Sequence, residues 1–189
     1  ARQPDVIMFD EPLTNVDVET KVQLKQALKE LTAQLKKTVI YVTHDQTDAM
    51  TLADQIALMR DGVIVQCDAP RTLYNYPNDV FGGWFLGNPG MNFFEHDVQF
   101  DGNVARLVSP LFPSPMILSG LGDNQKITIG IRPECVRVSA EQGPGMVYGE
   151  LDRKSIVVGG QYLLVIKVGE LLLKAKVESE VGFGLSDGL

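Results

Sequence analysis

Two short, continuous apolar runs in the first part of the chain predict neighbouring strands of a parallel sheet. They occupy residues 6–9 and 39–42, and each stops at polar residues, Asp10 and Glu11 after the first run and His44 shortly after the second. A continuous apolar run of this length, closed by a turn, is typical of a strand that is buried on both faces. Ligands of parallel sheets bind beyond the carboxyl ends of the strands, so these polar residues are candidates for a functional site.

The segment between the two runs predicts a helix that Asp17 caps and that extends to about Lys37. Leucines at alternating spacings of four and three residues share one face of this helix, and we expect that face to be buried. They are Leu24, Leu28, Leu31 and Leu35. Lys21, Lys25 and Lys29 share another face, which we interpret as solvated, with an anionic partner as the alternative. Strand, helix and strand together predict a right-handed crossover unit.

Patterning beyond the second run predicts a short helix at residues 48–53 and then a hairpin. In the hairpin, Asp61-Gly62 is the turn between apolar runs at residues 56–59 and 63–65. Two short helical pieces, each marked by a proline, then extend to Leu86. The first part of the chain is therefore predicted to be an α/β domain.

The pattern changes at residues 87–90, whose sequence Gly-Asn-Pro-Gly predicts a linker. Short β-rich runs separated by turns follow, with hairpin tips expected at Gly159-Gly160 and Gly169-Glu170. The runs are residues 104–108, 127–131, 156–158, 162–168 and 171–177. We therefore expect one domain over residues 1–87 and, over residues 88–189, an all-β domain that resembles a small barrel of the oligonucleotide/oligosaccharide-binding (OB) type.

Composition and charge narrow the possible partners. The 189 residues are 44% apolar, as in a folded globular protein, and a formal net charge of -7 without a basic cluster argues against nucleic acid as a partner. Cys67 and Cys135 lie far apart in the sequence, so we interpret them as small buried hydrophobic residues in a reducing cytoplasm. No apolar stretch approaches the roughly 20 residues that span a bilayer. A link to a membrane is therefore expected only through a partner.

Asp10, Glu11 and His44 have the chemistry of a phosphoryl-transfer site. Two adjacent acids at a strand end suit a hard cation and a reacting water, because one carboxylate can hold Mg²⁺ while the other orients or deprotonates the water. His44 follows the neighbouring strand, which brings an imidazole near the same phosphate. Each signal alone is more typical of a turn, a helix cap or a structural histidine. Only their joint order along the chain is specific.

The series Asp10-Glu11, Asn15, Asp17 and then His44, 33 residues after Glu11, closely resembles the ATP-binding subunits of ABC transporters. In that family these segments are the Walker B strand, the D-loop and the H-loop. The resemblance implies that Asp10 helps to hold Mg²⁺ through water, that Glu11 is the catalytic base, and that His44 contacts the γ-phosphate of ATP. It also implies that Asn15 and Asp17 belong to the loop that crosses to a second subunit.

Residues 87–94 and 130–134 resemble the sugar and polyol branch of these importers, the maltose-importer type. Polyamine, iron, sulfate and molybdate importers carry related domains and are the alternatives. The resemblance implies a homodimer that sits in the cytoplasm, on the inner face of the cell membrane, through transmembrane permease subunits. It also implies a P-loop (RecA-like) parallel sheet followed by a TOBE-type β domain that dimerises and can bind a small-molecule or protein regulator.

Three motifs of this family do not occur in the sequence: the phosphate loop, the Gln loop and the Leu-Ser-Gly-Gly-Gln signature. The chain also begins at Ala1 and ends without an obvious terminal element, so we expect a C-terminal fragment with an incomplete β domain. Because the phosphate loop positions the nucleotide, we expect the fragment alone to be inactive and its intact parent to hydrolyse ATP. We also expect its first domain to expose an apolar sheet edge and to be fragile, swapped between chains or prone to aggregation.

Two other functions remain as alternatives. The fragment could serve as a non-enzymatic dimerisation and regulatory module, for which its β domain is the reason. A soluble ABC-type ATPase of DNA repair or translation would share Asp10, Glu11 and His44, but the long coiled coils or basic linkers of such proteins do not occur in this sequence.

Overall fold

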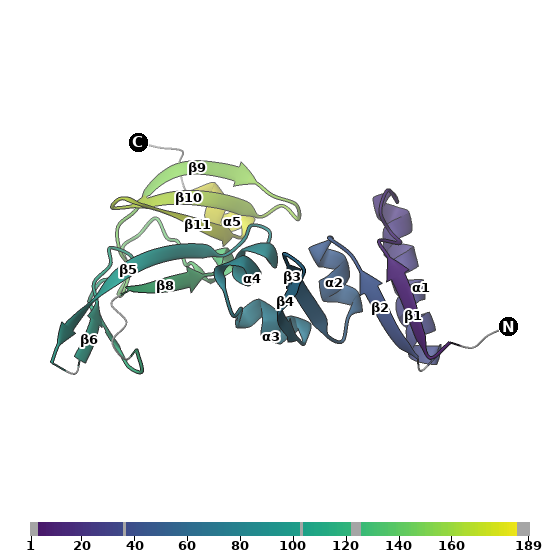
Figure 1. Cartoon of the computed structure of the whole chain (residues 1–189). Helices are drawn as coiled ribbons and strands as arrows, with labels where there is room; N and C mark the ends of the chain where they lie inside the picture. Colours follow the sequence, from purple (N-terminus) through teal and green to yellow (C-terminus); the bar gives the residue numbers. More distant parts are fainter. Residues whose placement is uncertain (1–3, 36, 103, 122–125, 185–189) are drawn as a thin grey trace. The chain divides into compact units, whose positions relative to one another are not determined.

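The computed structural model describes residues 4–35, 37–102, 104–121 and 126–184. It divides the chain into two compact units, Ala1–Gly87 (unit 1) and Asn88–Leu189 (unit 2) (Figure 1). The expectations about the first residue and the end of the chain concern residues outside these described ranges. Within them, no helix combines the length and the apolarity that crossing a bilayer requires.

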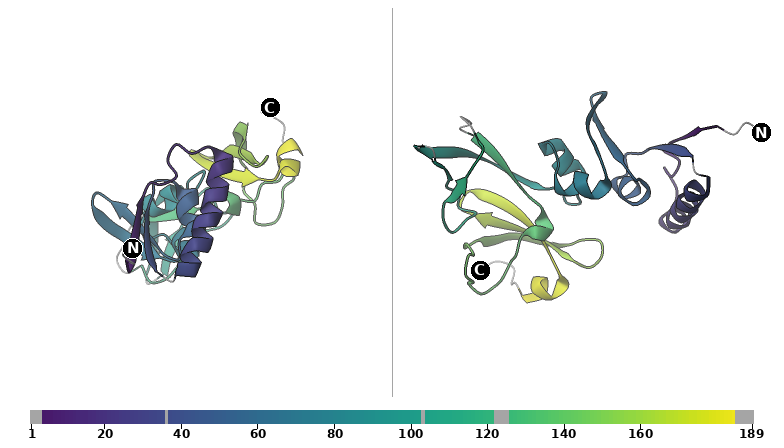
Figure 2. Two further views of the ribbon diagram at one scale, coloured as in Figure 1. Left: turned by 90° about the vertical axis from the view of Figure 1, so that its right-hand side faces the viewer. Right: turned by 90° about the horizontal axis from the view of Figure 1, so that it is seen from below.

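Unit 1 mixes helices and strands. Its elements are β1 (Val6–Asp10), α1 (Val18–Leu35), β2 (Thr38–Val42), α2 (Gln46–Leu52), β3 (Ile56–Arg60), β4 (Val63–Asp68), α3 (Pro70–Asn75) and α4 (Val80–Phe85). Strands β1 and β2 form a parallel pair, as the apolar runs predict, and Figures 1 and 2 show α1 running along one side of it. Asp10 lies opposite Val42 in the register, so the two strands end at the same edge.

The prediction that this pair is buried on both faces is wrong for the described part of the chain. Side chains alternate along a strand, and here the set that includes Phe9 and Tyr41 is half-buried while the other set is exposed. The exposed apolar residues, which we call the open face, are Val6, Met8, Ile40 and Val42, with exposures between 44% and 68%. No element within the described ranges covers them.

The interpretation of the lysine row on α1 as a solvated face is wrong for Lys21 and Lys25, although Lys29 is exposed. The side chains of Lys21 and Lys25 are only 20% and 17% exposed, because they turn toward α2 and pair with its acidic residues. On the predicted leucine face, Leu24 and Leu31 are exposed. The side chain of Leu35 lies outside what the structure describes. Leu28 is half-buried, so the leucine face is covered only in part, and Lys21 and Lys25 share the covered side of α1.

The β3–β4 hairpin of unit 1 forms where the sequence predicts it. Asp61 and Gly62 both have positive φ, 51° and 80°, as the tight turn of a two-residue hairpin requires. Beside the hairpin, α3 and α4 complete a small core of Ile56, Leu58, Leu73 and Leu86. Cys67 on β4 is exposed, which corrects its interpretation as a buried residue. The inward position is taken by its neighbour Gln66, whose amide hydrogen-bonds the backbone of residues 76–78.

Unit 2 consists mainly of two antiparallel sheets with strand orders β7-β6-β5-β8 and β11-β10-β9. Its elements are β5 (Asn92–Asp101), β6 (Val104–Leu107), β7 (Met116–Leu118), β8 (Lys126–Ile131), the 3-10 helix η1 (Pro133–Cys135), β9 (Glu150–Ile156), β10 (Tyr162–Val168), β11 (Leu171–Val177) and α5 (Ser179–Gly184). The predicted strand at residues 156–158 is misplaced, because β9 ends at Ile156. Cys135 is exposed and not buried as predicted.

The side chain of Asn92 joins the two sheets of unit 2. Its Nδ2 donates to the carbonyl oxygens of Ile131 on β8, at 3.1 Å, and Lys174 on β11, at 2.9 Å, while its Oδ1 accepts from the N–H of Lys174 at 2.8 Å. The chain is thus mixed α/β in unit 1 and β-rich in unit 2. A RecA-like sheet in unit 1 and an OB-like domain in unit 2 stay predictions.

Candidate functional site

The backbone holds Glu11 between the ends of the two parallel strands. The N–H of Glu11 donates to the carbonyl oxygen of Val42, the last residue of β2, at 2.9 Å. Glu11 has φ of 44°, a left-handed conformation that costs an L residue other than glycine about 1–2 kcal/mol. Such conformations concentrate at functional sites, where the surrounding structure maintains them. Glu11 is therefore placed by the sheet in spite of its own backbone preference.

The side chains of Glu11 and His44 contact each other. Nδ1 of His44 lies 3.0 Å from Oε1 of Glu11, and the hydroxyl of Thr14 donates to Oε2 at 3.2 Å. The hydrogen bond from His44, with a smaller contribution from Thr14, lowers the pKa of Glu11 below its ordinary value. An ionised carboxylate can only accept, so Nδ1 carries the proton and Nε2 is left for another partner. Both side chains remain open to solvent, with exposures of 44% and 70%.

The other three predicted site residues occupy distinct positions around this pair. Asp10 is the exposed last residue of β1. Asn15 has φ of 65°, a conformation that asparagine tolerates better than most residues, and lies in the exposed loop before α1. Asp17 caps α1 by accepting the N–H of Thr20 at 3.0 Å, and this backbone hydrogen bond is the main reason that the pKa of Asp17 is lowered.

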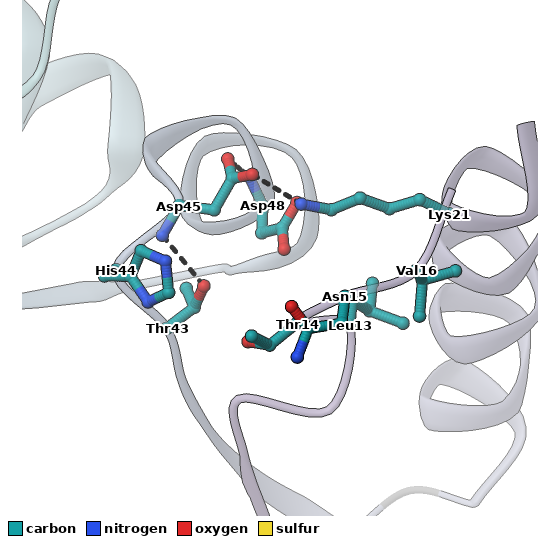
Figure 3. Close-up of a pocket in the computed structure, with 9 residues that line it drawn as sticks. All are labelled: Leu13, Thr14, Asn15, Val16, Lys21, Thr43, His44, Asp45 and Asp48. Carbon is teal, nitrogen blue, oxygen red and sulfur yellow. Dashed lines mark hydrogen bonds and ion pairs between the residues drawn. The ribbon is translucent and has the colours of Figure 1, made fainter. Parts of the chain in front are cut away.

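A shallow hollow of about 250 Å³ lies where the Glu11–Asp17 loop faces the start of α2 (Figure 3). It is lined by Leu13, Thr14, Asn15, Val16, Lys21, Thr43, His44, Asp45 and Asp48. His44 and Asn15 both line the hollow, whereas Asp10, Glu11 and Asp17 are not among its lining residues. The structure brings Glu11 and His44 into contact and leaves the other predicted residues nearby along the chain.

An ion-pair cluster that the sequence did not predict forms part of the lining of this hollow. Asp48 on α2 is 2% exposed, and its Oδ1 lies 3.2 Å from Nζ of Lys21 and 2.6 Å from Nζ of Lys25. Lys21 also pairs with Asp45, the N-cap of α2. The hydrogen bond that Lys21 donates to Asp45 is the largest reason that the pKa of Lys21 is raised. The lysine row was the available signal, and its acidic partners are Asp45, which caps α2, and Asp48, which lies in the first turn of α2.

The donor set suits magnesium only in combination with a nucleotide. In the described residues, no group of three or more His, Cys, Asp or Glu side chains is placed to hold a metal ion. Mg²⁺ generally keeps several waters and is bound by one or two carboxylates together with substrate phosphates. The exposed carboxylate of Asp10 at the strand end fits that pattern. The described residues do not provide the several protein ligands that a dedicated metal site would need.

No family model matches the chain. Individual proteins do match it. The chain is 42% identical over 135 residues, which are 70% of its length and 37% of the relative's, to the osmoprotective compounds uptake ATP-binding protein GgtA of Synechocystis sp.. It is 40% identical over 139 residues, 70% of its length and 38% of the relative's, to the lactose transport ATP-binding protein LacK of Rhizobium radiobacter.

A third relative matches more of the chain. The sn-glycerol-3-phosphate import ATP-binding protein UgpC of Bordetella avium is 36% identical over 170 residues, which cover 88% of this chain and 47% of that protein. The chain therefore spans less than half the length of these three relatives. The resemblance predicted from the strand-end residues is confirmed: the chain belongs to the ATP-binding proteins of ABC transporters.

Proposed function

We propose that the chain is part of the ATP-hydrolysing subunit of an ABC importer for sugars or polyols. The observation that carries the proposal is the contact between Glu11 and His44 at the shared edge of two parallel strands, 3.0 Å between Oε1 and Nδ1. The relatives support it, since the names of LacK and UgpC assign lactose transport and sn-glycerol-3-phosphate import to those proteins.

In this proposal Glu11 is the general base of ATP hydrolysis. Its carboxylate is ionised near neutral pH, as that of an ordinary glutamate is, and its side chain is 44% exposed, so it can accept a proton from the attacking water. His44 donates from Nδ1 to Glu11, which fixes the imidazole and directs Nε2 away from the pair. Nε2 would then be the ring nitrogen that contacts a γ-phosphate oxygen. The two residues thus orient the water and the phosphate relative to each other.

Asp10 would hold Mg²⁺ through water next to this pair. When bound with ATP, the ion neutralises charge on the β- and γ-phosphates. Asp10 contributes a single exposed carboxylate for this purpose, one residue before the base. Asn15 and Asp17 would lie where the loop reaches a second copy of the subunit, and the strained φ of Asn15 together with the cap formed by Asp17 gives that loop a defined shape.

The chain alone is proposed to be inactive. Glu11 and His44 are exposed and act on a nucleotide only when other groups hold it, and the sequence contains no phosphate loop. In the intact protein, we propose a homodimer that associates with transmembrane permease subunits at the cytoplasmic face of the membrane. Unit 2 would be the OB-like regulatory and dimerisation domain, over residues 88–189. Its separate core around Leu164 and Ala175 supports an independent role.

The proposal is tested with the intact protein reconstituted with its permease and binding subunits in lipid. ATP hydrolysis is measured with sugars, polyols, polyamines, iron, sulfate and molybdate, each added separately. We expect stimulation by a sugar or polyol only. Stimulation by one of the other solutes would overturn the substrate class, and the lack of any ATP hydrolysis by the assembled complex would overturn the function itself.

A further inference from the structure

Lys21 connects the two segments that carry the candidate catalytic residues. Its backbone N–H donates to the carbonyl oxygen of Asp17 at 2.9 Å, in the first turn of α1, directly after the loop that begins at Glu11. Its ammonium group crosses to the start of α2, where it pairs with Asp45 and, at 3.2 Å, with Asp48 (Figure 3). One side chain therefore links the segment that follows β1 to the segment that follows β2.

Asp45 directly follows His44 in the chain, and its carboxylate is held on both sides. Oδ1 of Asp45 accepts from the N–H groups of Thr47 and Asp48 at 2.8 and 3.2 Å and so caps α2, while its Oδ2 binds Lys21. Partial burial alone would raise the pKa of Asp45, but the hydrogen bonds from Lys21 and from the backbone outweigh it and the pKa is lowered. Both oxygens of Asp45 are thus fixed, one by α2 and the other by α1.

A comparison with Lys25 distinguishes two effects of Lys21: its contact with Asp45 and its neutralisation of the buried Asp48. Both lysines neutralise the buried Asp48, and Lys25 is the closer one, with 2.6 Å between Nζ and Oδ1. Among the described ion pairs, Lys25 contacts Asp48 but not Asp45. If burial of Asp48 were the only purpose of the cluster, the two lysines would be equivalent. Their different reach toward Asp45 makes them distinguishable.

We propose that Lys21 is a positioning residue for the reaction: its ion pair with Asp45 fixes His44 relative to Glu11. The inference rests on the proposed function, since it concerns the rate of that reaction. Lys21 itself contacts neither member of the pair in the described contacts, so it acts through Asp45. Loss of the link would let the start of α2 shift, and displacements of about 1 Å at a reacting geometry can lower a rate by up to about 100-fold.

The kinetic test compares Lys21→Met with Lys25→Met in the intact protein assembled with its permease. We expect Lys21→Met to lower kcat by about 10- to 100-fold with little change in KM for ATP. Lys25→Met leaves the ion pair between Lys21 and Asp45 in place and should therefore lower kcat by less than about threefold. Lys21→Arg, which keeps the charge, should restore most of the turnover. Equal losses in the two methionine variants would overturn the proposal.

A double variant tests whether Lys21 acts through His44. Residues that work as one unit show non-additive effects, so Lys21→Met should cause no further loss in a His44→Ala background. An undiminished additional loss there would contradict the proposal. Nucleotide binding and thermal unfolding are measured on each variant, so that an unfolded protein is recognised.

A spectroscopic readout keeps this inference separate from the proposed function. The chain has two histidines, His44 and His96, and selective labelling makes their imidazole signals observable in the intact protein, assigned by His44→Ala. We expect Lys21→Met to shift or broaden the His44 signal and to leave the His96 signal unchanged, while Lys25→Met leaves both in place. An unchanged His44 signal in Lys21→Met would overturn the inference even if the protein hydrolyses ATP. A changed one would support it even if ATP is not the substrate.

Discussion

His44 and Glu11 are 33 residues apart in the sequence, yet Nδ1 of the imidazole lies 3.0 Å from Oε1 of the carboxylate. The contact exists because β1 and β2 are neighbours in parallel register, so that the residues following both strands emerge at one edge. Thr14 holds the second oxygen of Glu11. The site is therefore a product of strand pairing, and its integrity depends on the α1 crossover that brings β2 beside β1.

Acid should weaken unit 1 first at this edge. The pKa values of Glu11, Asp17 and Asp45 are all lowered in the folded protein. A lowered carboxyl pKa contributes stability above the unfolded value, about 4, and that stability is lost as the pH falls through the folded value. We expect the temperature at which half of the intact protein is unfolded to decrease steadily as the pH is lowered below about 4.

His44→Ala supplies the control for this pH dependence. It removes the largest cause of the lowered pKa of Glu11, so the pKa of Glu11 should rise toward its ordinary value. The carbon signal of the Glu11 carboxyl group, followed by NMR during an acid titration, reports this directly. His96→Ala should leave the titration of Glu11 unaltered. The same Glu11 titration in both variants would contradict the assigned contact.

Removing the carboxylate of Asp48 should destabilise unit 1. Asp48→Ala leaves the partly exposed ammonium group of Lys25 without its partner and removes one of the two partners of Lys21, and loss of a charge-assisted hydrogen bond costs about 1.5–3 kcal/mol. Urea unfolding of the intact protein measures the loss. Asp54→Ala, at an exposed position just after α2, should change stability by no more than about 0.5 kcal/mol. Equal stability of the two variants would show that the cluster is not structural.

The open face should make the isolated chain bind hydrophobic dyes and self-associate. Val6, Met8, Ile40 and Val42 form an exposed apolar surface on two paired strands. Replacing the register partners Met8 and Ile40 together by threonine should lower both dye fluorescence and the scattering mass. Val158→Thr, at a position that is 97% exposed in unit 2, should change neither. If the isolated chain without substitutions is a monomer that binds the dye only weakly, this expectation is contradicted.

The sequence predicts most elements because their signals are local. Proline and glycine positions locate the β3–β4 hairpin and the short helices, and strands β10 and β11 match their predicted runs. The prediction misplaces strand β9 because the sequence of this strand, Glu-Leu-Asp-Arg-Lys-Ser-Ile, is mostly polar. Only Leu151 and Lys154 in it are even half-buried. Its position is determined by its pairing with β10, which its own pattern of apolar residues does not reveal.

The candidate site is predicted in part for a similar reason. Glu11 and His44 could be paired from the sequence because parallel strands share a ligand edge. The period of α1 places its lysines on one face, but a period does not show which side is covered. Cys67 was misjudged because the inward place beside it goes to Gln66, whose amide satisfies loop backbone. Such exchanges depend on tertiary contacts that the pattern of apolar positions does not encode.

The rate of ATP hydrolysis by the Glu11→Gln variant of the intact protein tests the central claim most directly. Glutamine keeps the shape of the side chain but cannot act as a base, and a general base contributes about 100- to 10,000-fold. We expect turnover to fall by at least about 100-fold while nucleotide binding persists, with Glu30→Gln on the exposed side of α1 behaving like the unaltered protein. Unchanged hydrolysis in Glu11→Gln would contradict the assignment of Glu11 as the base.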